Sequence, residues 1–175
     1  MTGQDASPSG WKLDFIIPAN RWPVTFSPPQ YDESLDDVRS LLRDLCAAFA
    51  RENAQFVLSS PEAGAWPVDV ATDLPVVIEQ MPKLLHFLQN PASDGFELDV
   101  YTQGIELRIE LRKADEVIEA ICLPFGETRR PERSISTVTA WQGMVSGFWD
   151  KFYRATEERA PLTVQHPWWK QWMLD

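Results

Sequence analysis

The side chains most able to do chemistry are carboxylates in a segment where polar and apolar residues alternate. The segment covers residues 96–123 and contains three short runs separated by turn-like breaks. Alternation with a period of two predicts β-strands, and a two-residue break ending in Gly104 suits a tight hairpin turn that needs positive φ. We therefore predict a three-stranded antiparallel meander with one apolar face and one charged face.

The hairpin turn at residues 103–104 fixes which charged residues face one another on the first two strands. The facing pairs are Asp99 with Arg108 and Glu97 with Glu110. If a short turn at residues 113–116 returns the chain, Glu119 falls opposite Glu110. The sequence then predicts a row of carboxylates, Glu97, Glu110 and Glu119, across three strands.

Such a row is compatible with several kinds of chemistry. Facing carboxylates about 5 Å apart have the separation used by retaining glycosidases, although any facing pair on a sheet has it too. Carboxylate oxygens also suit Mg²⁺ or Ca²⁺, but the sequence holds no loop of spaced acids to complete the coordination. The simplest interpretation is a solvated face, where water and salt relieve the repulsion.

A further hypothesis is that the meander is a docking surface for a basic protein. Complementary charge raises the rate of encounter, and charge-assisted hydrogen bonds fix the register of a complex. An aromatic side chain in line with the acids would serve as an anchor. The predicted partner-binding residues are Glu97, Asp99, Tyr101, Glu106, Glu110 and Glu119. Apolar residues on the same face of the third strand (Val117, Ile121 and Leu123) predict that part of this strand is covered.

Sequence motifs of catalysis are missing. The chain has no glycine-rich phosphate loop, no dinucleotide fingerprint, no paired-cysteine motif and no nucleophile elbow. With two histidines, His86 and His166, a multi-histidine metal site is excluded, and both fit structural roles better than catalysis. Cys46 and Cys122 sit among apolar neighbours, which favours buried free thiols. We predict no cofactor and no metal, and a binding protein in preference to an enzyme.

Composition limits the partners. The 175 residues carry 26 acidic and 16 basic side chains, a formal net charge of −10. Long-range repulsion therefore opposes nucleic acids and anionic membranes and favours a basic partner. No run approaches the length of a membrane span, and the first residues lack the features of a secretory signal, so a cytoplasmic location is expected.

The remaining elements place the meander in an α+β fold. We predict a first strand at residues 11–17, a Pro-rich loop at 18–30, a short strand near 55–59 and a charged loop at 124–133. Helices with one apolar stripe are predicted at Asp32–Asn53, Leu74–Gln89 and Thr137–Glu158, the second kinked or divided at Pro82. They would pack on the apolar face of one antiparallel sheet of four or five strands. Residues 1–10 form a predicted disordered tail, and residues 11–175 a single domain.

The functional hypothesis is an inhibitor that neutralises a basic partner, as a bacterial immunity protein neutralises a toxin. One alternative is a small-molecule binder or hydrolase with an aromatic pocket made from Trp11, Trp22, Trp66 or Trp141. The other is a structural adaptor or secretion chaperone that uses the Pro-rich loop or the aromatic tail at residues 168–172. Charge reversal on the meander would disable only the first.

Overall fold

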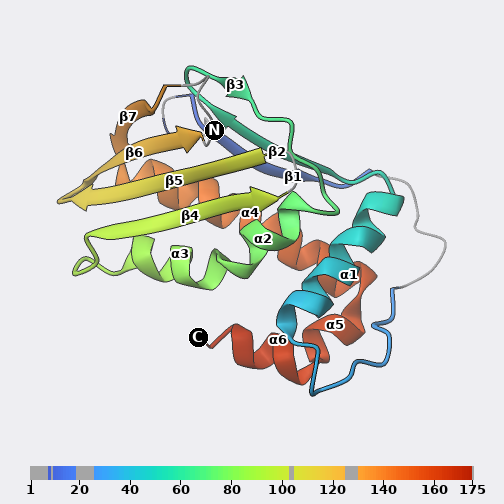
Figure 1. Ribbon diagram of the computed structural model, residues 1–175. Helices are drawn as coiled ribbons and strands as arrows, with labels where there is room; N and C mark the ends of the chain where they lie inside the picture. Colours follow the sequence, from blue (N-terminus) through green and yellow to red (C-terminus); the bar gives the residue numbers. More distant parts are fainter. Residues whose placement is uncertain (1–7, 9, 19–25, 103–104, 125–129, 175) are drawn as a thin grey trace, which may run out of the picture.

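The computed structural model (Figure 1) describes residues 8, 10–18, 26–102, 105–124 and 130–174, with the backbone alone for residues 101, 102, 105 and 106. In chain order the elements are β1 (Lys12–Ile16), α1 (Val38–Arg51), β2 (Gln55–Ser60), β3 (Gly64–Ala65), α2 (Asp73–Glu79), α3 (Met81–Gln89), β4 (Gly95–Thr102), β5 (Ile105–Ala114), β6 (Val117–Pro124), β7 (Glu132–Thr137), α4 (Val138–Arg159), α5 (Pro161–Gln165) and α6 (Pro167–Trp172). Antiparallel sheets and packed helices confirm the predicted α+β class.

The strands form two sheets, and the prediction of one sheet was wrong. One sheet has the order β1-β2-β3 and the other the order β4-β5-β6-β7. The first strand pairs with β2, so that Leu13 faces Leu58 and Phe15 faces Phe56. Strand β7 begins at the end of the predicted charged loop (124–133) and continues to the start of α4, and it adds a fourth strand to the meander.

The helices follow the predicted apolar stripes, with corrected ends. Helix α1 begins at Val38, because the Asp37 carboxylate caps it by accepting a hydrogen bond from the Arg39 amide at 2.8 Å. Residues 33–35 form a turn ahead of it instead of helix. The chain divides at Gln80 into α2 and α3, with Pro82 in the first turn of α3. Helix α4 is capped by Thr137.

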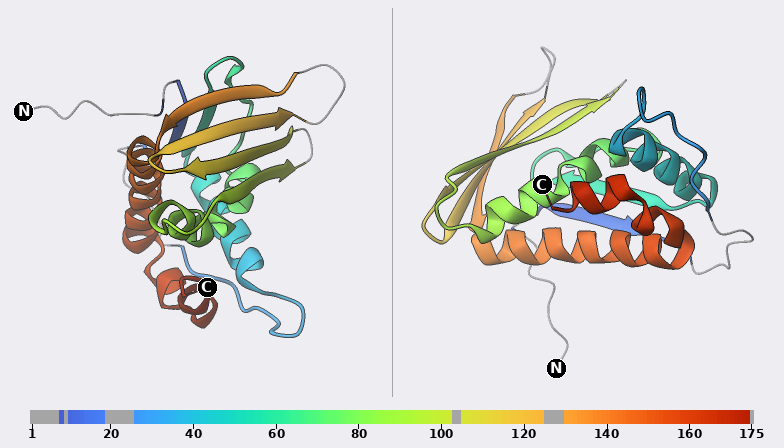
Figure 2. Two further views of the ribbon diagram at one scale, coloured as in Figure 1. Left: turned by 90° about the vertical axis from the view of Figure 1, so that its left-hand side faces the viewer. Right: turned by 90° about the horizontal axis from the view of Figure 1, so that it is seen from below.

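Aromatic rings join the first sheet to the helices around it. The Phe15 ring lies 5.3 Å from that of Phe49 on α1 and 5.5 Å from that of Phe152 on α4, between centroids. The C-terminal helix adds Trp169, whose ring stacks 6.5 Å from that of Phe152. The aromatic tail at residues 168–172 is therefore packed against the body of the protein, and Figure 2 shows α6 lying beside α1 and α4.

The two sheets are tied together by the buried carboxylate of Glu132, at the start of β7. Glu132 is only 5% exposed, and its carboxylate accepts hydrogen bonds from Ser60 Oγ at 2.7 Å and Glu62 N at 2.7 Å. Ala63 N donates a third, at 3.3 Å. These donors belong to β2 and to the turn before β3. Glu132 therefore fixes that turn against the edge of the larger sheet.

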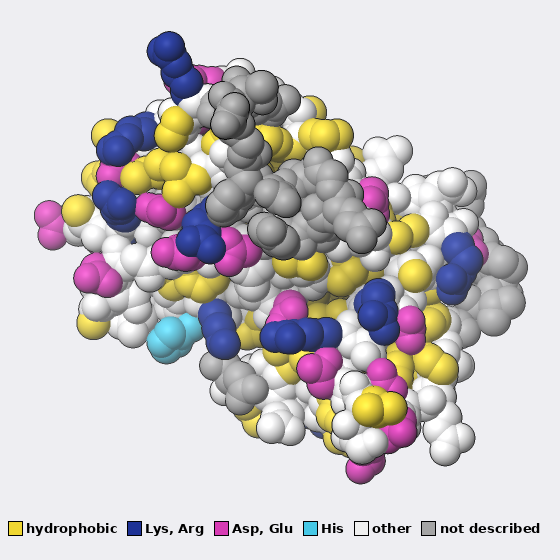
Figure 3. Space-filling view, viewed as in Figure 1, with side chains coloured by type: hydrophobic (Ala, Val, Ile, Leu, Met, Phe, Trp, Pro, Cys, Tyr) yellow, Lys and Arg dark blue, Asp and Glu magenta, His cyan; other side chains and the backbone are white. Residues whose placement is uncertain are grey.

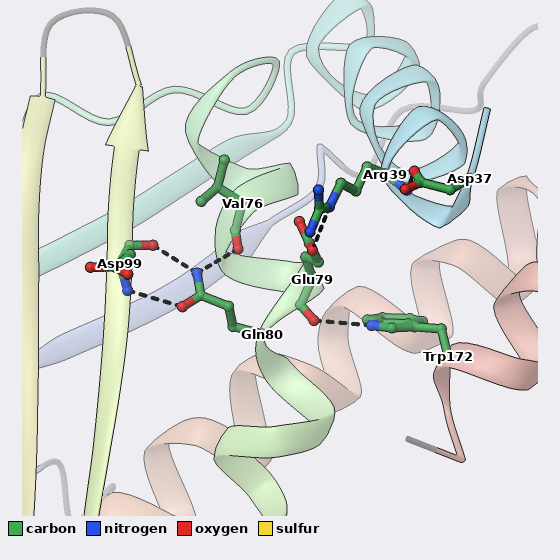
Figure 4. A network of polar contacts seen from close by, with 7 residues as sticks. All are labelled: Asp37, Arg39, Val76, Glu79, Gln80, Asp99 and Trp172. Atoms are coloured by element: carbon green, nitrogen blue, oxygen red, sulfur yellow. Dashed lines mark hydrogen bonds and ion pairs between the residues drawn. The ribbon is translucent and has the colours of Figure 1, made fainter. Parts of the chain in front are cut away.

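The junction of α2 and α3 meets three other parts of the chain (Figure 4). The Gln80 amide pairs with the backbone of Asp99 on β4, at 3.0 Å and 2.7 Å. The Glu79 carboxylate accepts a hydrogen bond from Arg39 Nε on α1 at 2.7 Å, and its backbone oxygen accepts one from Trp172 Nε1 on α6 at 3.0 Å. The junction is thereby held between the larger sheet and the helical end of the molecule.

Lys113 of β5 caps the end of α3. Its ammonium donates to the backbone oxygens of Phe87 at 2.5 Å and Asn90 at 2.9 Å, and it lies 4.7 Å from the Phe87 ring centroid. The last carbonyls of a helix have no intrahelical partners and carry partial negative charge. The Lys113 ammonium, supplied by β5, satisfies these carbonyls and holds the end of α3 against the larger sheet.

Candidate functional site

Alternation along the four strands β4 to β7 separates an apolar face from a charged face. The inward residues are 0–4% exposed and pack under the helices (Leu98, Val100, Leu107, Ile109, Leu111, Ile118, Ala120 and Cys122). Figure 2 shows α3 and α4 against this side of the sheet. We call the opposite side the outer face; it is built by Glu97, Asp99, Arg108, Glu110, Arg112, Val117, Glu119, Ile121, Leu123, Arg133 and Ile135.

The predicted register of the first hairpin is confirmed. Glu97 faces Glu110, and Asp99 faces Arg108. The backbones of Tyr101 and Glu106 also pair with one another, but their side chains lie outside the described part of the chain.

The predicted register of the third strand was wrong by two residues. Glu119 faces Arg112, whereas Ile121 faces Glu110. The turn consists of residues 115 and 116 alone, and Asp115 adopts the left-handed conformation with φ of 52°. Glu97, Glu110 and Glu119 therefore do not form one straight row across the strands.

Each described acid of the outer face forms an ion pair with an arginine of a facing or nearby position. Arg108 bridges two acids of β4, with Nη1 3.0 Å from a carboxylate oxygen of Glu97 and Nε 2.8 Å from one of Asp99. The remaining pairs, Arg112 with Glu110 and Arg133 with Glu119, are both 3.0 Å apart. The outer face is therefore a mosaic of alternating charge and not an uninterrupted acidic patch.

The two acids beside Arg108 favour the charged form of that arginine. A hydrogen bond to Asp99, followed by the charge of that carboxylate, raises the pKa of the Arg108 guanidinium.

The side chain of Glu97 is 56% exposed and that of Glu110 only 23%. Glu97 is thus the better placed of these two acids to meet a partner from solution.

The outer face also carries apolar side chains. Ile135 is 69% exposed and Val117 is 40% exposed, at the β7 side of the sheet. Ile121 lies between Glu110 and Arg133 in the register and is only 3% exposed. The predicted covering of the third strand is therefore confirmed at Ile121 but not at Val117.

Two residues of the outer face, Arg133 and Ile135, were missed by sequence reasoning because a loop was predicted up to residue 133 and no strand before the helix at Thr137. A signal was present: Arg133, Ile135 and Thr137 alternate with Glu132, Ser134 and Ser136 directly before the capped helix. The inward positions are small or polar, so the usual apolar alternation is absent. One inward residue, Ser134, accepts a hydrogen bond from Trp11 Nε1 at 2.6 Å.

The described residues of the outer face do not form an arrangement that supports the catalytic or metal-binding interpretations. No group of three or more histidine, cysteine or acidic side chains able to hold a metal ion occurs among the described residues. Four hollows on the described surface are lined by residues of other elements. Burial raises the pKa of the Cys46 thiol well above its usual value, which disfavours a reactive thiolate. Both cysteines are buried and unbridged, as predicted.

The aromatic residues proposed for a ligand pocket are mostly part of the core. Trp11, Trp66 and Trp141 are 2%, 9% and 3% exposed, and the first and last of these rings lie 5.5 Å apart. Trp22 lies outside the described residues. His166 uses Nδ1 to accept a hydrogen bond from the Trp168 amide at 3.3 Å, a capping role at the start of α6.

Comparison with known proteins adds no identification: no protein-family model, curated protein or solved structure matches the chain. Among the described helices, none combines the length and apolar character needed to cross a bilayer.

Proposed function

We propose that this protein is a non-enzymatic inhibitor that neutralises a basic protein partner, in the manner of an immunity protein, and that the outer face is its docking surface. The observation that carries the proposal is the mosaic of ion pairs on that face, together with exposed Ile135. Side chains held on strands lose little freedom when a partner binds. Apolar and charged groups are thus presented together in a fixed pattern.

Charge would contribute to binding in two ways: the net charge attracts the partner, and the pattern of charges on the outer face fixes how the partner is aligned. The net charge of −10 attracts a basic protein over distances comparable with the Debye length, about 8 Å at physiological salt. At short range, the alternating acids and arginines reject a surface whose charges are out of step, because like charges brought together cost free energy. Val117 and Ile135 would supply apolar contact beside them.

Charge reversal at Glu97 tests the proposal. The protein is immobilised to capture basic proteins from host lysate at low salt, and the association rate of the captured partner is then measured. Glu97→Lys is expected to slow association at least tenfold. Glu33→Lys, an equal change of charge at an exposed residue of the turn before α1, serves as the matched control and is expected to slow it about twofold at most.

Two results would contradict the proposal. One is equal slowing by both variants, which would mean that net charge alone matters and the outer face does not. The other is failure to capture any basic protein at low salt. Glu97→Gln, which keeps the shape of the side chain and adds no cation beside Arg108, separates loss of binding from strain within the sheet.

A further inference from the structure

Three hollows adjoin one another along helix α1, on elements separate from the outer face. The first has a volume of about 180 Å³ and lies between the start of α1, α3 and Trp172. It shares Arg39 and Glu79 with a second, of about 430 Å³, between α1 and α2. The second shares Ala71 and Thr72 with a third, of about 660 Å³, between the end of α1 and β2. Because each hollow shares two lining residues with the next, we call the three together the trough.

The two ends of this trough differ in chemistry. Cationic side chains gather in the first two hollows, which are lined by Lys83, Arg39 and Arg43. The third hollow is mainly apolar and is lined by Ala50, Ala54, Phe56, Val57, Val68 and Val70 among others. Figure 3 shows dark-blue and yellow side chains intermingled on the part of the surface over α1 and α2.

The two arginines are arranged to receive an anion. They are four residues apart on α1, so they project from the same side of the helix on successive turns. Glu79 engages Nε of Arg39, which leaves the two terminal nitrogens of that guanidinium without a hydrogen bond to any other described residue. The Arg43 side chain makes no hydrogen bond or ion pair with another residue in the described ranges. Figure 4 shows how Glu79 holds Arg39 in place.

Three acids line the trough, and each already accepts a hydrogen bond. Asp37, in the first hollow, accepts one from the Arg39 amide at 2.8 Å. Glu79 is the partner of Arg39. Asp69 accepts hydrogen bonds from the amides of Ala71 at 2.7 Å and Thr72 at 2.8 Å, and from the Thr72 hydroxyl. Asp69 lines the third hollow and does not line the second, where Arg39 and Arg43 lie. Of the three acids, Glu79 is the one that lines the same hollow as Arg43.

We propose that this trough is a binding site for a small amphipathic carboxylate. The carboxylate head lies between Arg39 and Arg43, and accepts charge-assisted hydrogen bonds from their guanidinium groups. The apolar chain runs over Pro75 and Val76 of α2 and past Thr72 into the third hollow. The proposal is independent of inhibition through the outer face.

Binding of decanoate, kept below its micelle concentration, tests this site by isothermal titration calorimetry on the full chain. Decanoate is expected to bind at one site, and hexanoate at least tenfold more weakly, because each buried methylene contributes about fourfold in affinity. Decyltrimethylammonium, with the same chain and the opposite charge, is expected not to bind there. If both detergents bind equally, the arginines play no part and the proposal is wrong.

Variants of the arginines complete the test. Arg43→Gln is expected to weaken decanoate about tenfold, since a charge-assisted hydrogen bond is lost. Arg51→Gln removes the same charge from an exposed residue of α1 that lines none of these hollows, and is expected to leave the affinity unchanged. Equal affinity of the wild type and Arg43→Gln would overturn the proposal. Because Arg43 has no ion pair to lose among the described residues, the folded structure is expected to tolerate the change.

Discussion

The side chain of Gln80 pairs with the backbone of Asp99 as a neighbouring strand would. Gln80 Oε1 accepts a hydrogen bond from the Asp99 amide at 3.0 Å, and Gln80 Nε2 donates to the Asp99 carbonyl at 2.7 Å. Strand β4 is at one edge of its sheet, where unpaired backbone groups invite another chain to add a strand. A single amide thus closes the middle of this edge.

Replacing this amide is expected to weaken the fold and expose the edge. Gln80→Leu should lower the free energy of unfolding by about 1–2 kcal/mol, because two backbone groups of Asp99 lose their partner. It should also promote self-association through β4, detectable by sedimentation velocity. Gln89→Leu, at an exposed position on α3, is the control. A change in urea unfolding no larger than about 0.5 kcal/mol, as at an ordinary surface site, would contradict this role.

A second prediction concerns Glu132, whose carboxylate joins the two sheets. Glu132→Gln keeps the size of the side chain but turns one of its two acceptor oxygens into an amide donor. That donor faces either the Glu62 amide, which is bonded to one oxygen, or the Ala63 amide, which is bonded to the other. The free energy of unfolding is expected to fall by roughly 1–3 kcal/mol, measured by urea titration. Glu62→Gln, on an exposed side chain of the same turn, should have little effect. If the two variants are equally stable, Glu132 does not hold the sheets together.

A third prediction concerns the ammonium that caps α3. Lys113→Met retains most of the apolar stem and removes the donor to the Phe87 and Asn90 carbonyls. We expect a loss of about 1–3 kcal/mol in the free energy of unfolding. Amide exchange should accelerate in the last turn of α3. Lys12→Met, at an exposed position of β1, should change neither measurement, and unaltered exchange in Lys113→Met would refute the capping role.

A fourth prediction is that stability falls in alkali. Burial raises the pKa of the Cys46 thiol above its ordinary value of 9.0. The pKa of the Tyr31 hydroxyl is raised above its ordinary value of 10.0 by burial, by the negative charge of Asp44 and by the hydrogen bond to that carboxylate. In alkali both groups stay protonated in the folded protein but ionise at their ordinary pKa values in the unfolded chain, so unfolding releases protons. Their contribution is complete below pH 9 and is lost as the pH rises further.

Urea unfolding at several pH values between 8 and 10.5 checks this expectation. For Cys46 the free energy of unfolding should fall by up to about 1.4 kcal/mol for each pH unit above the unfolded pKa. Cys46→Ala should reduce the slope even though its cavity lowers stability at every pH. Tyr31→Phe should reduce it at the upper end of the range. A slope that is identical in the wild type and in both variants would show that other groups cause the alkaline loss.

The sequence was sufficient for the β4–β5 hairpin but not for the β5–β6 hairpin, and the reason is geometric. A slip of one residue moves apolar side chains to the wrong face, so the hydrophobic pattern forbids it. A slip of two residues keeps every side chain on its correct face. The hydrophobic pattern therefore could not distinguish a four-residue turn from the two-residue turn at Asp115. For the same reason it could not predict the pairing of Glu119 with Arg112.

The rest of the candidate sites depends on contacts between residues far apart in the chain. The approach of α1 to α2 brings Arg39 to Glu79, and nothing in either local sequence indicates the pair. Strand β7 is hidden for a related reason: its inward Glu132 is buried only because β2 and its turn supply the donors. Polar residues whose burial is made possible by distant partners leave no local apolar signal.

The packing of the indole rings has a consequence for spectroscopy. Trp172 lies 5.8 Å from Trp149 and 5.1 Å from Trp169 between ring centroids, and all three belong to the helical end of the molecule. Chromophores this close and this firmly oriented give strong circular dichroism in the near ultraviolet, a signal that disappears when side-chain packing loosens while helices persist. The protein thus carries an intrinsic optical probe of whether α6 is seated against α4.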